Sequence, residues 1–123
     1  MPTGDWVIEF DNIKTSSTDS YNQAQIDIGA VANRITFGQV TGSGKLQVIE
    51  IHNSSVIQTK NNGTMPMNTL VTHRLEFVNG VYKYTVLGNS VTLTPQYITS
   101  PTEITTMRIG SYNKANNLKV KPL

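Results

Sequence analysis

The chain has 123 residues, a formal net charge of +2 and no cysteine. This length suits one domain around one hydrophobic core, so we expect residues 1–123 to form a single domain. The lack of cysteine excludes disulfides, thiolate metal sites and a cysteine nucleophile. Lysines and arginines are scattered, and no apolar run approaches the roughly 20 residues that span a bilayer. We therefore expect neither nucleic-acid binding nor membrane insertion.

Apolar and polar residues alternate along most of the chain, and no long stretch has the spacing of an amphipathic helix. The pattern predicts a stack of β-strands. A first strand is predicted over residues 6–11, with alternate residues on opposite faces: Trp6, Ile8 and Phe10 inward, and Val7, Glu9 and Asp11 outward. Residues 12–22 are polar and predict a loop. Further strands are predicted at residues 24–28, 35–37 and 46–51, with a short one at 56–57.

The strongest local signal is Asn79-Gly80, which lies between two alternating runs and favours a two-residue hairpin turn. The turn sets a register in which apolar meets apolar and acid meets base: Val78 faces Val81, Phe77 faces Tyr82, Glu76 faces Lys83 and Leu75 faces Tyr84. A second turn at Gly88-Asn89 would place Val86 opposite Val91 and Tyr84 opposite Leu93. Both turns predict one continuous apolar face with Tyr82 and Tyr84 in the core.

Glycine and proline mark the remaining turns. The glycines of residues 41–44 predict a turn, and residues 61–67 predict a loop because Pro66 cannot donate to a strand ladder. Closing strands are predicted at residues 105–109 and 118–120. No internal repeat and no domain boundary are found. The succession of predicted strands indicates an all-β fold, an antiparallel β-sandwich.

Four segments together resemble the laminin G-like and concanavalin A-like sandwich domains, the jelly-roll modules of lectins, adhesins and virion fibres. They follow the family's order from end to end: Trp6–Phe10, His73–Gly80, Tyr82–Gly88, and Met107–Gly110 leading to Leu118–Leu123. The resemblance implies a concanavalin A-like jelly roll whose first and last strands share a sheet. It also implies a module of a larger protein at an extracellular, cell-surface or virion location.

No catalytic motif is found, and we expect that the chain is not an enzyme. Glycoside hydrolases of this sandwich type carry Glu-x-Asp-x-x-Glu on one strand, and no such run occurs here. Glu9 and Asp11 share a strand face, which we interpret as solvated surface rather than an acid–base pair. His52 and His73 are far apart in sequence, and no serine lies in a nucleophile elbow. A glycosidase would need carboxylates assembled from separate strands.

No cofactor is expected, and calcium is the one alternative. Sandwich domains of this kind often hold a calcium ion between loop carboxylates and carbonyls. The available acids are Asp11, Asp19 and Asp27, and they form no compact ligand series.

Sugar recognition usually combines an aromatic ring with amide and charged groups on a sheet face or at loop tips. Trp6, Tyr82 and Tyr84 are expected in the core. The candidate ligand-binding residues are polar or aromatic side chains on the opposite face or in loops: Arg74, Lys83, Tyr97, Arg108, Tyr112 and Asn113. The simpler interpretation of these residues is ordinary polar surface.

Two functions remain as hypotheses. The first is a non-catalytic recognition module for surface glycans in a tail fibre, adhesin or similar appendage, and it depends on the family resemblance. The second is a structural or oligomerisation domain whose partner is a surface protein or another copy of the chain. The apolar pairs Val48-Ile49 and Val56-Ile57 fit the second hypothesis if one sheet face meets a neighbour.

Overall fold

The computed structural model of the chain describes residues 4–14, 25–39, 44–64, 66, 69–100, 104–108 and 113–122. Within these residues the chain forms ten strands. Their bounds are β1 (Trp6–Lys14), β2 (Gln25–Gly29), β3 (Arg34–Gln39), β4 (Leu46–His52), β5 (Ser55–Asn62), β6 (Leu70–Val78), β7 (Val81–Val86), β8 (Asn89–Leu93), β9 (Ile104–Arg108) and β10 (Asn113–Pro122).

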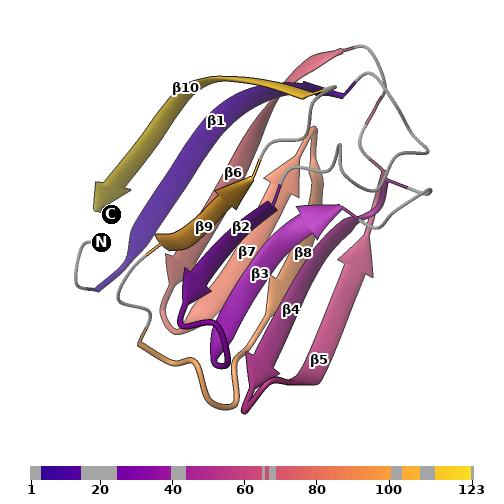
Figure 1. Cartoon of the computed structure of the whole chain (residues 1–123). Coiled ribbons are helices and arrows are strands. Elements are labelled where there is room, and N and C mark those ends of the chain that lie inside the picture. Colours follow the sequence, from indigo (N-terminus) through magenta and orange to yellow (C-terminus); the bar gives the residue numbers. More distant parts are fainter. Residues whose placement is uncertain are drawn as a thin grey trace.

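The strands form two antiparallel sheets that face each other as a β-sandwich (Figure 1). Sheet A has the order β10-β1-β6-β7-β8, and sheet B has the order β5-β4-β3-β2-β9. The predicted fold class, an antiparallel β-sandwich of jelly-roll type, is confirmed. Within the described residues, no helix is long and apolar enough to cross a membrane.

The core lies between the sheets and follows the alternation of the sequence. In β6 and β7 every second residue is buried, and these residues meet the inward residues of β2, β3 and β4. Trp6, Tyr82 and Tyr84 are buried as predicted. Burial of each large apolar side chain contributes roughly 1.5–3 kcal/mol, so this inter-sheet layer is the main source of stability. The outward-facing sides of both sheets take no part in this core.

The hairpin between β6 and β7 has the predicted register. All four predicted pairs are present, from Val78 opposite Val81 to Leu75 opposite Tyr84. Asn79 and Gly80 have φ angles of 50° and 77°, the left-handed conformation that a two-residue turn of this type requires. The Asn79 N–H also donates to Asp5 Oδ1 at 3.1 Å.

The turn between β7 and β8 differs from the prediction. Its two central residues are Leu87 and Gly88, so that Tyr84 lies opposite Val91 and Tyr82 opposite Leu93. The predicted pairing of Val86 with Val91 and of Tyr84 with Leu93 was wrong by two positions. A shift of two residues keeps every side chain on the same face, which is why the predicted apolar face is nevertheless correct.

Several strands are longer than predicted. Residues 12–14, predicted as loop, extend β1 because they pair with β6 and β10. Asn61 and Asn62, also predicted as loop, belong to β5 because they pair with Gln47 and Leu46. The predicted features at residues 15–24, 41–43 and 109 lie outside the described residues.

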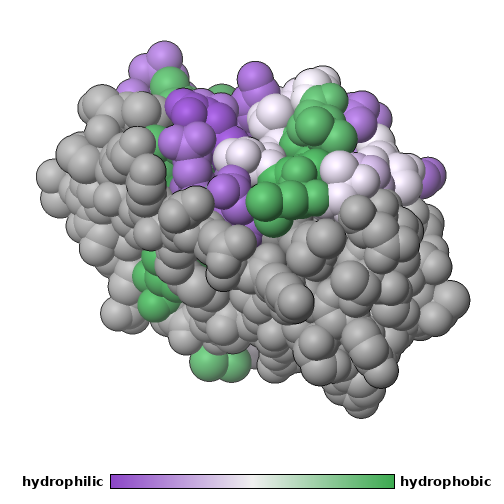
Figure 2. Space-filling view, turned by 90° about the horizontal axis from the view of Figure 1, so that it is seen from above, coloured by the Kyte–Doolittle hydropathy of each residue, from purple (hydrophilic) through white to green (hydrophobic). Residues whose placement is uncertain are grey.

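The first and last strands are neighbours, as the family resemblance implies. Trp6 lies opposite Pro122 in the β1–β10 ladder, and Figure 1 shows β1 and β10 side by side. The turns β2–β3 and β4–β5 and the β8–β9 loop all lie at the lower end in Figure 1, which we call the lower end of the sandwich. At the opposite end, seen from above in Figure 2, small hydrophobic groups lie among hydrophilic residues.

Candidate functional site

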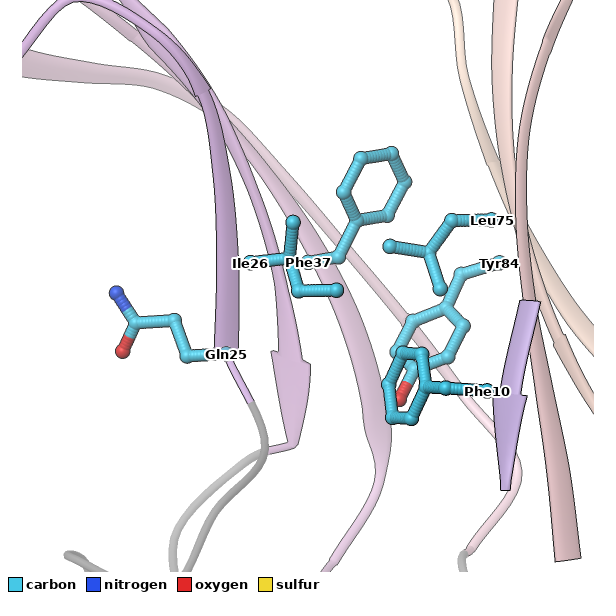
Figure 3. A pocket seen from close by; sticks show the side chains of 6 residues that line it. All are labelled: Phe10, Gln25, Ile26, Phe37, Leu75 and Tyr84. Atoms are coloured by element: carbon cyan, nitrogen blue, oxygen red, sulfur yellow. The ribbon is translucent and has the colours of Figure 1, made fainter. Parts of the chain in front are cut away.

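The outward face of sheet B is the first candidate surface. Ile26, Ile28, Ile35 and Phe37 fill the core, so the residues between them in β2 and β3 project away from it. Figure 3 shows this for β2, where Ile26 points between the sheets and Gln25 points away from them.

Four outward side chains form one hydrogen-bonded group, which we call the Asp27 network: Gln25, Asp27, Arg34 and Thr36. Thr36 Oγ1 donates to Asp27 Oδ1 at 2.7 Å, and Gln25 Nε2 donates to the two carboxylate oxygens at 3.1 and 3.2 Å. Arg34 Nε donates to Thr36 Oγ1 at 3.2 Å and lies 3.9 Å from Asp27 Oδ1. Arg34 Nη1 also donates to the carbonyl of Val31.

This network is ordered rather than loosely solvated. Asp27 is only 6% exposed, although it carries a charge. A buried carboxylate is stable only when donors and a cation compensate for its lost hydration, and the network supplies both. Arg34 keeps 26% of its side chain exposed, so its fixed guanidinium still faces solvent.

An apolar strip lies beside the network on the same face. Ile49 and Ile51 of β4 are half-buried and lie opposite Thr36 and Arg34 in the β3–β4 ladder. Val56 of β5, opposite Ile51, is 61% exposed. The outward face of sheet B therefore places fixed polar donors and acceptors next to aliphatic carbon, a combination that suits a sugar ring with hydroxyls on one side and C–H groups on the other.

A second surface lies at the lower end of the sandwich. The rings of His52, at the end of β4, and Tyr97, in the β8–β9 loop, are parallel within 2° with centroids 3.8 Å apart. Tyr97 is 51% exposed. We call this pair the His52–Tyr97 stack.

Buried Glu50 fixes the loop that carries Tyr97. Its carboxylate accepts hydrogen bonds from the backbone N–H groups of Gln96, Tyr97 and Ile98 at 2.8–3.0 Å and from Gln58 Nε2 at 2.8 Å. Burial raises the pKa of Glu50, but these hydrogen bonds oppose it and hold the pKa below its usual value. Glu50 is therefore a charged structural anchor.

Tyr82 fastens the same loop from sheet A. Its hydroxyl donates to the Ile98 carbonyl at 2.7 Å. Burial, together with the nearby Glu50 charge, raises the pKa of Tyr82, which keeps the hydroxyl protonated as a donor. The β8–β9 loop is thus held to both sheets.

Of the six predicted ligand-binding residues, the three whose side chains the structure describes do not lie together. Arg74 and Lys83 lie on the outward face of sheet A, where Arg74 forms ion pairs with Glu9 at 3.6 Å and Glu76 at 3.2 Å. Lys83 lies opposite Glu76 in the β6–β7 ladder. Tyr97 lies in the β8–β9 loop at the lower end of the sandwich, not on this face.

The other predicted residues are only partly described. Arg108 occupies the β9 position opposite Gln25, beside the Asp27 network, and Asn113 begins β10 opposite Lys14. The side chains of Arg108 and Asn113 are outside the described part of the structure, and Tyr112 is wholly outside it. Their role in binding stays a prediction.

The carboxylates considered for catalysis or calcium lie apart. Glu9 and Asp11 are on the outward face of sheet A, as predicted, where Asp11 Oδ1 accepts a hydrogen bond from Thr72 at 2.8 Å. Asp27 is on the outward face of sheet B, and Asp19 lies outside the described residues. Asp11 and Asp27 therefore cannot ligate one ion together.

The gap between the sheets is not a ligand site. It is lined by Phe10, Ile26, Phe37, Leu75 and Tyr84, whose side chains point toward one another in Figure 3, and by Gln25 at its edge. It has no space for a water molecule. This gap is therefore too tightly packed to admit a ligand.

The Asp27 network and the partners of Tyr97 were not among the sequence-based predictions. Part of the network could have been predicted. Gln25 and Asp27 alternate with the core residues Ile26 and Ile28, which places both on the outward face of one strand. Asp27 was considered only as an acid or metal ligand. Nothing local connects His52 with Tyr97, because the sandwich topology alone brings β4 and the β8–β9 loop together.

Comparison with known proteins identifies the fold. No protein-family model matches the chain, and no curated protein is similar enough in sequence to match. Among solved structures, chicken galectin 2 has a TM-score of 0.72 at 11% identity, over 94% of this chain and 89% of that one. Lactose- and MES-liganded congerin II has a TM-score of 0.67 at 10% identity, over 98% and 100%. The carbohydrate-binding module CBM66 from Bacillus subtilis has a TM-score of 0.69 at 10% identity, over 96% and 75%. The chain therefore has the concanavalin A-like sandwich fold of these lectins and modules.

Proposed function

We propose that this chain is a non-catalytic recognition module that binds glycans on the outward face of sheet B. The observation that carries the proposal is the Asp27 network, a partly buried and ordered polar group placed beside exposed aliphatic carbon on an open sheet. The fold supports it, because a lactose-liganded lectin and a carbohydrate-binding module share it.

The chemistry of the network suits sugar hydroxyls. A hydroxyl both donates and accepts hydrogen bonds, so adjacent hydroxyls are matched by a fixed set of amide, carboxylate and guanidinium groups. Gln25, Asp27 and Arg34 provide these three groups within one network. Ile49 and Ile51 would contact the C–H groups of the same ring.

The described carboxylates favour binding over hydrolysis. Glu50 is occupied by the β8–β9 loop, and Glu9 is paired with Arg74 on the other sheet. A glycosidase needs two carboxyl groups roughly 5–10 Å apart on either side of one bond, and these residues have other partners.

We place the module in a larger extracellular, cell-surface or virion protein such as a tail fibre or adhesin. The support is the adjacency of β1 and β10, which lets a domain be inserted in a longer chain without separating its neighbours.

A glycan array, run with calcium and with a chelator, tests the proposal. We expect binding that survives chelation, and a loss of about tenfold or more in affinity for Arg34→Ala and Asp27→Asn. Lys83→Ala, on the outward face of sheet A, is the matched control and should bind as the parent does. Failure of the parent domain to bind any sugar at high protein concentration would refute the proposal.

A protein partner is the second candidate. It is favoured by the exposed Val56 next to Ile49 and Ile51, an aliphatic strip that a second chain could cover. Light scattering tests whether this partner is a second copy of the chain. A multimer that dissociates on Val56→Asp supports the structural role, and a strictly monomeric mass counts against a homo-oligomer.

A further inference from the structure

We infer that the His52–Tyr97 stack is a second sugar contact, separate from the Asp27 network, in which a pyranose ring packs on the exposed aromatic surface at the lower end of the sandwich. This inference rests on the proposed glycan-binding function and adds a site to it. It depends on three observations: the geometry of the stack, its rigid support and the polar residues around it.

The geometry leaves an aromatic surface open to solvent. An exposed tyrosine in a loop ordinarily turns its ring freely, but here the imidazole of His52 lies flat against one face of the ring at 3.8 Å. Tyr97 is nevertheless 51% exposed. The C–H groups of a pyranose form a flat apolar patch that packs against such a ring.

The support beneath the stack is unusually strong for a surface loop. Three consecutive backbone N–H groups of residues 96–98 donate to one buried carboxylate, that of Glu50, and the Ile98 carbonyl accepts from Tyr82. Burial of a carboxylate carries a large desolvation cost. For Glu50, which has no exposed surface, the hydrogen bonds that offset this cost come chiefly from the loop that presents Tyr97. A ligand that binds to a fixed ring does not lose affinity by ordering it.

The neighbouring turn is fixed in the same way. The Asn53 N–H donates to Asn33 Oδ1 at 3.0 Å, and the Ser54 N–H donates to the Ala32 carbonyl at 2.9 Å. These bonds lock the β4–β5 turn to the β2–β3 turn. Asn53 Nδ2 lies 3.2 Å from His52 Nε2, which joins the turn to the stack.

Polar groups border the aromatic surface. Asn53 and Ser54 follow His52 in the chain and Gln96 precedes Tyr97, and all three are exposed and carry amide or hydroxyl groups. They supply both donors and acceptors without a net charge. A neutral hexose, with hydroxyls around the rim of an apolar ring face, fits this arrangement better than a charged or purely apolar ligand.

The test is a titration of the full chain with lactose, cellobiose and maltose, followed by NMR of the aromatic rings and by calorimetry. We expect the ring resonances of His52 and Tyr97 to shift with at least one disaccharide. Tyr97→Ala should weaken that binding about tenfold, whereas Tyr97→Phe, which keeps the ring and removes the hydroxyl, should retain most of it.

Leu87→Ala is the matched control, because Leu87 is an exposed apolar residue in the turn at the other end of the sandwich. Thermal unfolding of Tyr97→Ala should match that of the parent, which separates a binding defect from a folding defect. Equal affinity of Tyr97→Ala and the parent, with loss of binding only in Arg34→Ala, would overturn this inference and leave the proposed function intact. Absence of binding to all glycans would overturn both.

Discussion

His73 is the clearest case of a side chain whose environment, not its sequence neighbours, sets its chemistry. It is fully buried, its ring stacks on Phe10 with centroids 4.7 Å apart, and Nδ1 lies 2.6 Å from the Tyr84 hydroxyl. Burial lowers its pKa from 6.5 to about 4, and the charge of Asp11 only partly opposes this. The imidazole is therefore neutral at physiological pH and acts as a core hydrogen-bonding group.

The stability of the fold should consequently fall in mild acid. The unfolded chain binds a proton at His73 below pH 6.5, whereas the folded chain does not until about pH 4. His73 stabilisation is therefore complete above 6.5 and is lost progressively toward 4. Linkage predicts a loss of about 2 kcal/mol in unfolding free energy between pH 7 and pH 5. Urea unfolding at both pH values measures it.

The control for this prediction is His73→Phe, which keeps an aromatic ring beside Phe10 and removes the titration. Its absolute stability should be lower, because the Tyr84 hydroxyl loses its His73 partner. Its stability should nevertheless change less between the two pH values than that of the parent. An unchanged pH dependence would assign the effect to other groups.

Glu50 provides the second residue-scale prediction. Glu50→Gln should lower the unfolding free energy by about 2–4 kcal/mol, because an amide cannot accept from three backbone N–H groups as a carboxylate does. Since the folded pKa of Glu50 is lowered, its contribution is complete above its usual value of 4.5 and declines as the pH falls through the folded pKa. Denaturant unfolding of the parent and of Glu50→Gln measures the difference.

Glu76→Gln is the comparison for Glu50→Gln. Glu76 forms an ion pair with Arg74 at 3.2 Å near the solvent-facing side of sheet A. Such pairs contribute about 0.5 kcal/mol, so this change should be small. Equal losses in the two variants would contradict the anchoring role of Glu50.

At the scale of elements, the β6–β7–β8 meander shows what a local signal can and cannot specify. Asn79-Gly80 gave the correct register because both residues readily adopt the left-handed conformation that the turn needs. In the next turn this conformation falls on Leu87, with φ of 50°, which is an uncommon choice. Both possible registers of β8 keep Val91 and Leu93 inward, so alternation could not separate them.

Replacement of Leu87 by a residue that tolerates positive φ should therefore stabilise the fold. Leu87→Asn creates an Asn-Gly turn and should raise the unfolding free energy by about 0.5–1 kcal/mol, because Asn tolerates positive φ and Leu87 is exposed. Thermal or chemical unfolding checks this. Leu87→Ala retains the strain and should give no comparable gain, and a gain of equal size there would point to a different cause.

At the scale of the whole molecule, the fold is closed by strands from opposite ends of the chain. β1 lies between β10 and β6 in sheet A, and Trp6 of β1 is part of the core. Without β10, the backbone N–H and C=O groups along one edge of β1 would be unpaired and could bind other chains. An exposed strand edge of this kind promotes aggregation.

Removal of residues 113–123 should therefore destabilise the domain and promote association. Hydrogen exchange should be fastest in β1, and light scattering should show aggregates. A circular permutant that joins the two ends through a short Gly-Ser linker and opens between Leu87 and Gly88 keeps β10 and should fold as a soluble domain. Wild-type stability of the truncated chain would show that β10 is dispensable.

The sequence by itself determined the class of fold, the inward residues and the β6–β7 register, because these follow from alternation along a strand and from one tight turn. The tertiary structure alone decided which strands are neighbours. It placed Asp27 beside Arg34 and Thr36, and Tyr97 on His52. Both candidate binding surfaces depend on these contacts, because strand register sets the first and the path of the β8–β9 loop sets the second.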